Sequence, residues 1–513
     1  MIDHFINLLS QNRREEAHNF IDKLKETETK IFRQINPDLD TALLLTIHYN
    51  MDELALKILN THNAYPEYVD SHGNTALTLS IKKNMEEVSL KIIKLYHNYN
   101  INHVDAHGDT ALSASISMGL YNVALKLIEN PECKIDFVNE QGDTPLIMTI
   151  NWLGIFHYNE DPEELEELTE EELEKHEEEK AEKNKLFDKL KEGFEELSKK
   201  IILTKKSNPS YINKHGYTAL ELAICKDASD IALLILNNHS IEDLNPEHVC
   251  NIGDTPLTLA LSKNYEDIAN IIIDKYDCNP SHINNNGDTA LLLALCNDYY
   301  EIALKLVKMN DKNNHIINKS GDTAFLLALS KNYQDIAEIL LEQSIENIGH
   351  VGQNGDIALF LAINCGNEKL ALDIYETGES NYEYISKEPE SSLNMAINNG
   401  MLELAEKIIE TNTEKLIGFI NKENNTSLLI AISKQFWDIA TKLIKTGFSK
   451  PDHVNNEGDT ALLLVMHFGE LNIAFDLLLN TECNKHHENK DGLTAFQIAQ
   501  YRNYYEMFGL FEE

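Results

Sequence analysis

The sequence predicts an all-α solenoid, in which similar pairs of helices stack in a row, and three observations support this prediction. A motif of the form Gly-Asp-Thr-Ala-Leu recurs through the chain. Most copies lie about 34 residues apart, and a fixed period of this length is the signature of a solenoid. The residues after each copy fit two short helices in succession. Because repeats of this kind contact mainly their neighbours, all 513 residues can share one continuous core.

Each first helix is expected to begin at the threonine of the motif. This residue follows a turn and opens an apolar run, so its hydroxyl can accept hydrogen bonds from the first amides of a helix. The residues at the threonine position are Thr41, Thr75, Thr110, Thr144, Thr218, Thr255, Thr289, Thr323, Ile357, Ser391, Thr426, Thr460 and Thr494. The gap between Thr144 and Thr218 is the longest of the series, which indicates an insertion.

Each first helix is expected to end about nine residues after the threonine, where residue types that tolerate a left-handed backbone recur. These residues are Asn50, Asn84, Gly119, Asp227, Asn264, Asp298, Asn332, Gly366, Gly400, Gly469 and Asn503. A second helix follows, with the aliphatic, small and aliphatic spacing seen at Ile268, Ala269 and Ile272. This spacing is typical of one face of an amphipathic helix.

With these motifs, the chain resembles the ankyrin repeat family. The matching patterns are Gly-x-Thr-(Ala/Pro)-Leu and Ile-Ala-x-x-(Ile/Leu), and they extend over about nine tenths of the chain. The resemblance implies two helices and a short hairpin per repeat, and a role in protein–protein interaction. Two features depart from the family: no copy has the histidine of the family motif, and the hairpins are shorter. The wealth of Asn, Lys and Ile resembles the multi-repeat ankyrin proteins of giant DNA viruses, which implies the host cell cytoplasm.

The pattern divides the chain into five predicted segments, with about 14 repeats in all. Residues 1–36 form a degenerate N-terminal capping repeat, since terminal repeats need a polar outer face. Ankyrin repeats occupy 37–155 and 196–491, and a C-terminal capping repeat occupies 492–513. An acidic helical insertion over 156–195 separates the two helices of the fifth repeat.

The insertion is expected to form one long helix from Pro162 to Leu203, because only Gly193 interrupts its helical propensity. Glutamates crowd its first part. Two interpretations stay open. The insertion is either a solvated acidic helix that keeps the protein soluble, or a docking element for a basic partner with Glu171, Glu174 and Glu178 among its contacts.

Composition limits the classes of partner and compartment. The chain has 84 acidic and 44 basic residues, a formal net charge of −40, and such a surface repels nucleic acid and anionic membranes. Seven scattered cysteines without a Cys-x-x-Cys motif argue against a disulfide framework or a zinc site. No secretion signal or membrane span is recognisable. We therefore expect a cytoplasmic protein.

Catalysis is not expected, and neither a catalytic residue, a cofactor nor a metal site is predicted. Histidines recur seven residues before the threonine, as at His103, His350 and His453. Metal binding is the alternative use of such a column, but tyrosine and phenylalanine replace histidine in other repeats and cannot ligate in the same way. Stacking between adjacent hairpins is therefore the favoured role. No phosphate-binding loop or nucleophile motif is present.

The candidate binding site is an apolar column on the first helices, three and four residues after the threonine. Ankyrin repeats usually vary at the latter position, and a large exposed apolar patch marks a binding site. The candidate residues are Leu292, Leu293, Leu326, Leu327, Phe360, Leu361, Leu429 and Leu463. The alternative is that the first helices are simply buried more deeply than in the family.

The expected function is that of a non-catalytic scaffold that binds a protein partner through the concave face of the first helices, and through the acidic insertion as a further contact. An extended preorganised surface would supply affinity by many modest contacts. Two alternatives remain: a structural protein that assembles with copies of itself, and a substrate adaptor for a ubiquitin ligase. The sequence does not decide between a monomer and a homo-oligomer.

Overall fold

The computed structural model describes residues 2–24, 29, 30, 32, 41–96, 100–158, 170–276, 278–309, 312 and 314–512. The side chains of residues 2, 156–158, 170–180, 182 and 512 are outside this description. In the described residues the regular structure is helical, with only isolated bridges such as that between Val69 and Thr75. The chain forms two compact units, unit 1 (Met1–Asn279) and unit 2 (Pro280–Glu513).

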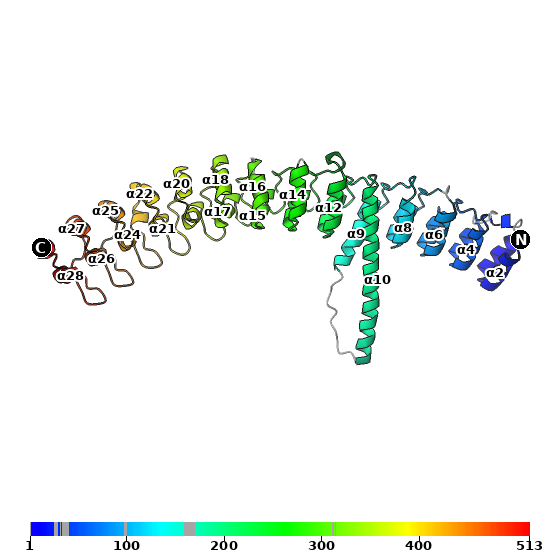
Figure 1. The fold of residues 1–513 in the computed structure, drawn as a ribbon, viewed down its shortest axis with the longest axis horizontal. Helices are drawn as coiled ribbons and strands as arrows, with labels where there is room; N and C mark the ends of the chain where they lie inside the picture. Colours follow the sequence, from blue (N-terminus) through cyan, green and yellow to red (C-terminus); the bar gives the residue numbers. More distant parts are fainter. Residues whose placement is uncertain are drawn as a thin grey trace. The chain divides into compact units, whose positions relative to one another are not determined.

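Unit 1 consists of helix pairs. Its helices are α1 (Ile2–Ser10), α2 (Arg14–Lys23), α3 (Ala42–His48), α4 (Asp52–Asn60), α5 (Ala76–Lys82), α6 (Glu86–Leu95), α7 (Ala111–Ser117), α8 (Tyr121–Ile128), α9 (Pro145–Tyr158), α10 (Glu170–Leu203), α11 (Ala219–Cys225), α12 (Ser229–Asn238), η2 (Ile241–Asp243), α13 (Pro256–Ser262) and α14 (Glu266–Lys275). Each first helix packs against its own second helix and against the first helix of the next pair, so the core lies within and between pairs. Figure 1 shows this succession of pairs.

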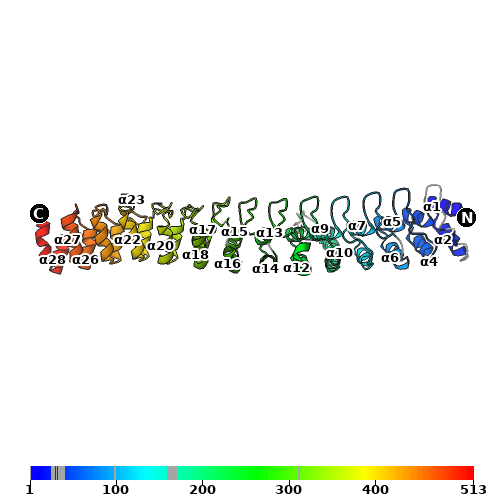
Figure 2. The ribbon, with the colours of Figure 1, turned by 90° about the horizontal axis from the view of Figure 1, so that it is seen from above.

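Unit 2 repeats the arrangement. Its helices are α15 (Ala290–Cys296), α16 (Tyr300–Lys308), α17 (Ala324–Ser330), α18 (Gln334–Gln343), α19 (Ala358–Asn364), α20 (Glu368–Glu376), α21 (Ser392–Asn398), α22 (Leu402–Glu410), α23 (Glu414–Ile417), α24 (Ser427–Ser433), α25 (Trp437–Lys445), α26 (Ala461–Phe468), α27 (Leu471–Asn480), α28 (Ala495–Arg502), η3 (Tyr505–Met507) and α29 (Phe508–Glu512). The loops that join successive pairs lie along one side of the helices (Figure 2).

The first helices begin where the sequence predicts. The threonine hydroxyl accepts a hydrogen bond from the amide three residues later, as in Leu292 N to Thr289 Oγ1 at 3.3 Å. Where that third residue is Ser, Thr, Glu or Gln, its side chain accepts a bond from the threonine amide, and Thr255 and Thr258 form such a capping box. Ile357 makes no side-chain cap, because it lacks an acceptor.

The first helices also end as predicted. The residues named above for this position all have positive φ, from 54° at Asn50 to 85° at Gly469. Gln435 adopts the same conformation, with a φ of 60°, although its type did not indicate it. In the second helices the small residue is fully buried, as at Ala269 and Ala303, so neighbouring helices can lie close together.

Helix α10 is longer than the other helices of unit 1, with 34 residues, and extends away from α8 and α12 (Figure 1). It begins at Glu170, and the predicted start at Pro162 is outside the described residues. Its final turns take the place of a second helix, because Phe194, Leu197 and Ile201 are buried.

Aromatic contacts fix α10 on the stack. The rings of Trp152 and Phe194 are stacked 5.0 Å apart, and Trp152 Nε1 donates a hydrogen bond to the Ile116 carbonyl at 2.8 Å. A Cβ at Gly193 would lie 2.5 Å from the Tyr121 ring. Glycine is therefore needed where α10 crosses Tyr121, and the one residue that weakened the predicted helix is explained.

Candidate functional site

The residues three positions after the threonine belong to the core. Leu292 is 1% exposed, and Leu326, Phe360, Leu429 and Leu463 are buried as well. The prediction that these side chains form an exposed apolar strip is therefore wrong. The physical reason is that each first helix packs on two sides, against its own second helix and against the next first helix, as α15 does with α16 and α17.

The residues four positions after the threonine behave differently in the two units. In unit 1 they are buried, and they are Leu45, Leu79, Ala114, Met148, Leu222 and Leu259. In unit 2 most are half-buried, and we call these the unit-2 leucine column: Leu293, Leu327, Leu361, Met395 and Leu464. One residue further along a helix turns the side chain by about 100°, from the core towards its edge. Leu293, Leu327 and Leu361 thus remain accessible to a partner.

A column of carboxylates accompanies these leucines in unit 2. The acidic residue directly before the threonine is half-buried in the repeats that carry it, and these residues are Asp288, Asp322, Asp356, Glu390 and Asp459. Sequence reasoning missed this column, because it interpreted Gly-Asp only as a turn. The regular recurrence of aspartate at one offset was the available signal.

Side-chain amides from the following hairpin hold several of these carboxylates. Asn318 Nδ2 donates to Asp288 Oδ1 at 2.7 Å, and Asn489 Nδ2 donates to Asp459 Oδ1 at 3.3 Å. The side-chain oxygen Oδ1 of Asn318 meanwhile accepts from the Asp322 amide at 2.9 Å. Burial raises the pKa of Glu390. Asp288 and Asp459 are therefore positioned by neighbouring repeats rather than free to rotate.

The column lies beside the last turn of the same first helix. In unit 1, Asn151 Nδ2 donates to Asp143 Oδ2 at 3.5 Å, which places the residue seven after the threonine next to the acid before it. In unit 2 this seventh residue is small, neutral and exposed in five repeats: Cys296, Ser330, Asn364, Asn398 and Ser433. No cation in these positions neutralises the acids.

The histidine column joins adjacent hairpins by hydrogen bonds. His103 Nε2 lies 2.8 Å from the Gly73 carbonyl, and His350 and His487 make the same contact with Gly321 and Gly458 at 2.9 Å. The predicted partner, the adjacent hairpin, is confirmed, but the contact is a hydrogen bond rather than a ring stack. In the part of the chain that the structure describes, no group of three or more His, Cys, Asp or Glu could hold a metal ion.

His248 has a different partner, the buried carboxylate of Glu221. Its Nδ1 lies 2.8 Å from Glu221 Oε1, and the glutamate side chain is fully inaccessible to solvent. Glu221 Oε2 also accepts from the Thr218 amide at 2.8 Å and closes a capping box. Burial raises the pKa of Glu221, and the bonds from Thr218 and His248 offset this only in part.

Replacing Glu221 by glutamine is expected to flatten the dependence of stability on pH. Because the folded-state pKa is raised, the stabilisation is complete below the usual value near 4.5 and is lost as the pH rises through the folded-state pKa. E221Q cannot ionise and does not lose this stabilisation. The free energy of unfolding of E221Q minus that of the parent should therefore increase by about 1 kcal/mol from pH 4 to pH 8. Urea unfolding at each pH measures the difference. A constant difference would show that the carboxylate does not titrate in this range.

The cysteines show no reactive environment. All seven are free thiols, and burial raises the pKa of Cys133 to about 11 and that of Cys225 to about 12. A thiol with a raised pKa is a poor nucleophile at neutral pH. These side chains therefore do not indicate catalysis.

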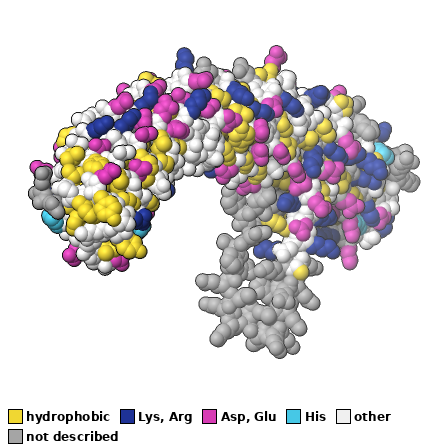
Figure 3. Space-filling view, turned by 60° about the vertical axis from the view of Figure 1, so that its left-hand side comes forward, with side chains coloured by type: hydrophobic (Ala, Val, Ile, Leu, Met, Phe, Trp, Pro, Cys, Tyr) yellow, Lys and Arg dark blue, Asp and Glu magenta, His cyan; other side chains and the backbone are white. Residues whose placement is uncertain are grey.

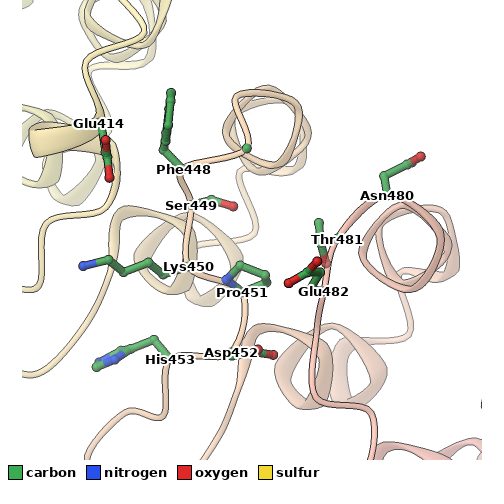
Figure 4. A pocket seen from close by; sticks show the side chains of 11 residues that line it. Glu414, Phe448, Ser449, Lys450, Pro451, Asp452, His453, Asn480, Thr481 and Glu482 are labelled. Carbon is green, nitrogen blue, oxygen red and sulfur yellow. The ribbon is translucent and has the colours of Figure 1, made fainter.

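An open cavity of about 710 Å³ lies between two loops of unit 2 (Figure 4). Lys450, Asp452, His453 and Glu482 are among its lining residues. Two of them already have protein partners: His453 Nε2 lies 3.0 Å from the Asn424 carbonyl, and Asp452 accepts from the Asn484 amide. The cavity therefore does not assemble a set of free catalytic groups.

Glu171, Glu174 and Glu178, the predicted contacts of the acidic insertion, lie in α10. Their side chains are outside the described part of the structure, so their role in binding stays a prediction. Among the described residues, no helix is both long and apolar enough to cross a membrane.

A comparison with protein families agrees with the helix pairs in part of the chain. A family model described as ankyrin repeats (3 copies) matches residues 239–316. No curated protein matches the chain. A solved ankyrin repeat domain from Acinetobacter baumannii AYE is 24% identical, covers 37% of this chain and 95% of its own, and superposes with a TM-score of 0.31. The resemblance to viral proteins has no support in these comparisons and stays a prediction.

Proposed function

Because the chain has an ankyrin-repeat fold, and ankyrin repeats generally mediate protein–protein interactions, we propose that it is a non-catalytic scaffold for a basic partner protein. The unit-2 leucine column and the carboxylates beside it form the contact surface. The observation that supports the proposal is that several repeats each offer one half-exposed aliphatic side chain and one half-buried carboxylate. The next repeat holds two of these carboxylates, Asp288 and Asp459, by side-chain amides.

The chemistry of this surface favours lysine and arginine side chains with apolar stems. Such side chains can cover aliphatic groups while their charged ends meet carboxylates. Preorganised acids lose little conformational entropy on binding, so each contact contributes more of its energy to affinity. The net charge of −40 also speeds the approach of a basic partner. The glutamates of α10 are a second proposed contact for the same partner.

Capture from cells of the source organism, with matched variants, tests the proposal. One variant combines Leu293→Ser, Leu327→Ser and Leu361→Ser. A second combines Asp288→Asn, Asp322→Asn and Asp356→Asn. Its control removes three exposed acids from second helices, Glu301→Gln, Glu342→Gln and Glu410→Gln. Each variant is first shown by circular dichroism to retain the parental helix content and unfolding midpoint.

We expect both test variants to lose the captured partner and the control to keep it. With the purified partner, the dissociation constant should rise at least about tenfold for the test variants. Equal capture by all variants would contradict the proposal. Loss of the partner only when Glu171, Glu174 and Glu178 are replaced by glutamine, a change that keeps the buried Phe194, would instead assign binding to α10.

A further inference from the structure

The C-terminal end of unit 2 carries an apolar patch, which we call the C-terminal patch and define as Leu493, Phe496, Tyr501, Tyr505 and Phe508. Tyr501 is 87% exposed, Tyr505 69% and Leu493 43%. Hydrophobic side chains gather at this end of the unit (Figure 3). Surface hydrophobic residues that occur singly need no explanation, but a contiguous patch does.

Ring contacts join three members of the patch, Phe496, Tyr505 and Phe508. The ring centroids of Tyr505 and Phe508 are 5.5 Å apart, and the same distance separates Phe496 from Phe508 and Phe496 from Phe511. Phe511 is buried beneath them. Tyr505 is therefore held against a packed aromatic cluster.

Equivalent aromatic residues elsewhere in unit 2 are covered by the next pair. Tyr505 lies eleven residues after its threonine, and Tyr300 and Trp437 occupy this position in other repeats. Tyr300 packs against Tyr333 at 5.2 Å, and Trp437 packs against Phe468 at 6.0 Å, in both cases edge to face and across to the next pair. Tyr505 is exposed at the same position, so its ring can make a similar edge-to-face contact with another aromatic ring.

The other members of the patch replace polar residues. Leu493 stands directly before Thr494, where other repeats of unit 2 place the carboxylates Asp288, Asp322 and Asp459. Tyr501 stands seven residues after Thr494, where five other repeats of unit 2 have small neutral residues and the repeat of Thr460 has His467. These two positions are neighbours, as the contact of Asn151 with Asp143 shows. The acidic surface of the inner repeats therefore becomes apolar at this end.

We propose that the C-terminal patch binds the same patch of a second copy of this chain, to give a two-fold symmetric dimer. Leu493, Tyr501 and Tyr505 together supply the apolar and aromatic anchors that are enriched at interfaces. In a two-fold contact the same surface of both copies is used. If one residue contacts a second residue of the other copy, the reverse contact is also made, so the patch must be self-complementary. Arg502 and Glu506, both exposed and of opposite charge, adjoin Tyr501 and Tyr505 and allow reciprocal charge pairs.

The opposite end of the chain argues against head-to-tail assembly. The exposed side chains described in α1 and α2 are polar or charged, and they include Asp3, His4, Asn7, Glu15 and Asn19. Among the described side chains of α1 and α2, the apolar ones are buried or only partly exposed. A two-fold contact between C-terminal patches closes at two copies by its symmetry and does not continue into a filament.

Salt should strengthen the dimer. Two copies that each carry a formal charge of −40 repel one another, and dissolved ions screen this repulsion. An apolar contact does not lose strength on screening. Partner binding by the carboxylates of unit 2 should instead weaken with salt, so the two proposals predict opposite responses.

Sedimentation equilibrium of the full chain over about two decades of protein concentration tests the proposal. We expect a reversible monomer–dimer equilibrium that shifts towards the dimer at higher salt. The variant Tyr501→Ser/Tyr505→Ser should raise the dissociation constant of the dimer at least about tenfold. Leu479→Ser is the matched control, because Leu479 is 63% exposed. The same position is also exposed in the five preceding repeats of unit 2, at Lys308, Glu342, Glu376, Glu410 and Lys445.

Three outcomes would overturn the proposal: a monomer at every concentration, a dimer that survives the double tyrosine change, or assemblies that grow beyond two copies. Equal weakening by Leu479→Ser would also overturn it, because the contact would then not be confined to the end of the unit. Loss of the dimer without loss of the captured partner, or the reverse, separates this proposal from the scaffold function.

Discussion

Replacing Leu292 by glutamate is expected to unfold the repeats around α15. The leucine side chain is 1% exposed, so a carboxylate in its place would be buried without a partner. A buried unpaired charge costs at least about 4 kcal/mol, a large part of the stability of a typical domain. Because α15 packs against α16 and α17, the loss should spread to neighbouring pairs. Far-ultraviolet circular dichroism during urea unfolding, with hydrogen exchange of the α15 amides, measures the effect.

Leu293→Glu is the matched control for this experiment. Leu293 is the adjacent residue of the same helix and is half-buried, so its carboxylate can reach water. We expect it to cost about 1 kcal/mol and to leave α15 folded. If the two variants unfold at the same urea concentration, Leu292 does not have the core position assigned to it here.

This pair of leucines also shows how far the sequence determines the binding surface. Both positions are apolar in many repeats, and a helical period places both on the side that faces other helices. Which of them is covered depends on how closely the next pair packs, and this distance is a property of the stack. The helix pairs, their threonine caps and their left-handed ends could be predicted, because each depends on residues within one repeat.

The contacts between hairpins of adjacent repeats could not be predicted in the same way. The sequence showed the histidine column and indicated that it contacts the adjacent hairpin. It did not indicate that the contact is a hydrogen bond. The bond from His350 to the Gly321 carbonyl joins residues of two repeats, and so does the bond from Asn318 to Asp288. In the sequence, contacts between two repeats are visible only as a residue type that recurs at the same position of successive repeats. The carboxylate column was overlooked for this reason, although it is now the central part of the proposed surface.

Lys82→Ser is expected to lower the free energy of unfolding of unit 1 by about 2 kcal/mol. Lys82 Nζ lies 2.6 Å from Asp105 Oδ2, and the aspartate side chain is fully buried. The other oxygen, Oδ1, accepts from the amides of His107 and Asp109 at 2.8 and 3.2 Å. Serine would leave a buried carboxylate without its cation. The expected cost is below that of a completely buried pair, because Lys82 is a quarter exposed.

The effect should depend on pH with a defined sign. Burial by itself raises the pKa of Asp105, but the Lys82 ammonium and the two amides outweigh it and hold the pKa below its usual value of 3.8. A depressed folded-state pKa stabilises the protein above the unfolded value, and this stabilisation is lost as the pH falls through the folded-state pKa. The difference between parent and Lys82→Ser should therefore be largest near neutral pH and shrink below about pH 4.

The chain itself supplies the compensating change. The equivalent pair in the next repeat is Ser117 and Asn139, and Asn139 Oδ1 accepts from the Asp143 amide at 2.9 Å without any charge. Lys82→Ser combined with Asp105→Asn reproduces this pair, so we expect its stability to return to within about 1 kcal/mol of the parent. Urea unfolding of the four proteins of this cycle gives the coupling between the two side chains. If the double variant is as unstable as Lys82→Ser, the loss comes from packing of the lysine stem and not from the unpaired carboxylate.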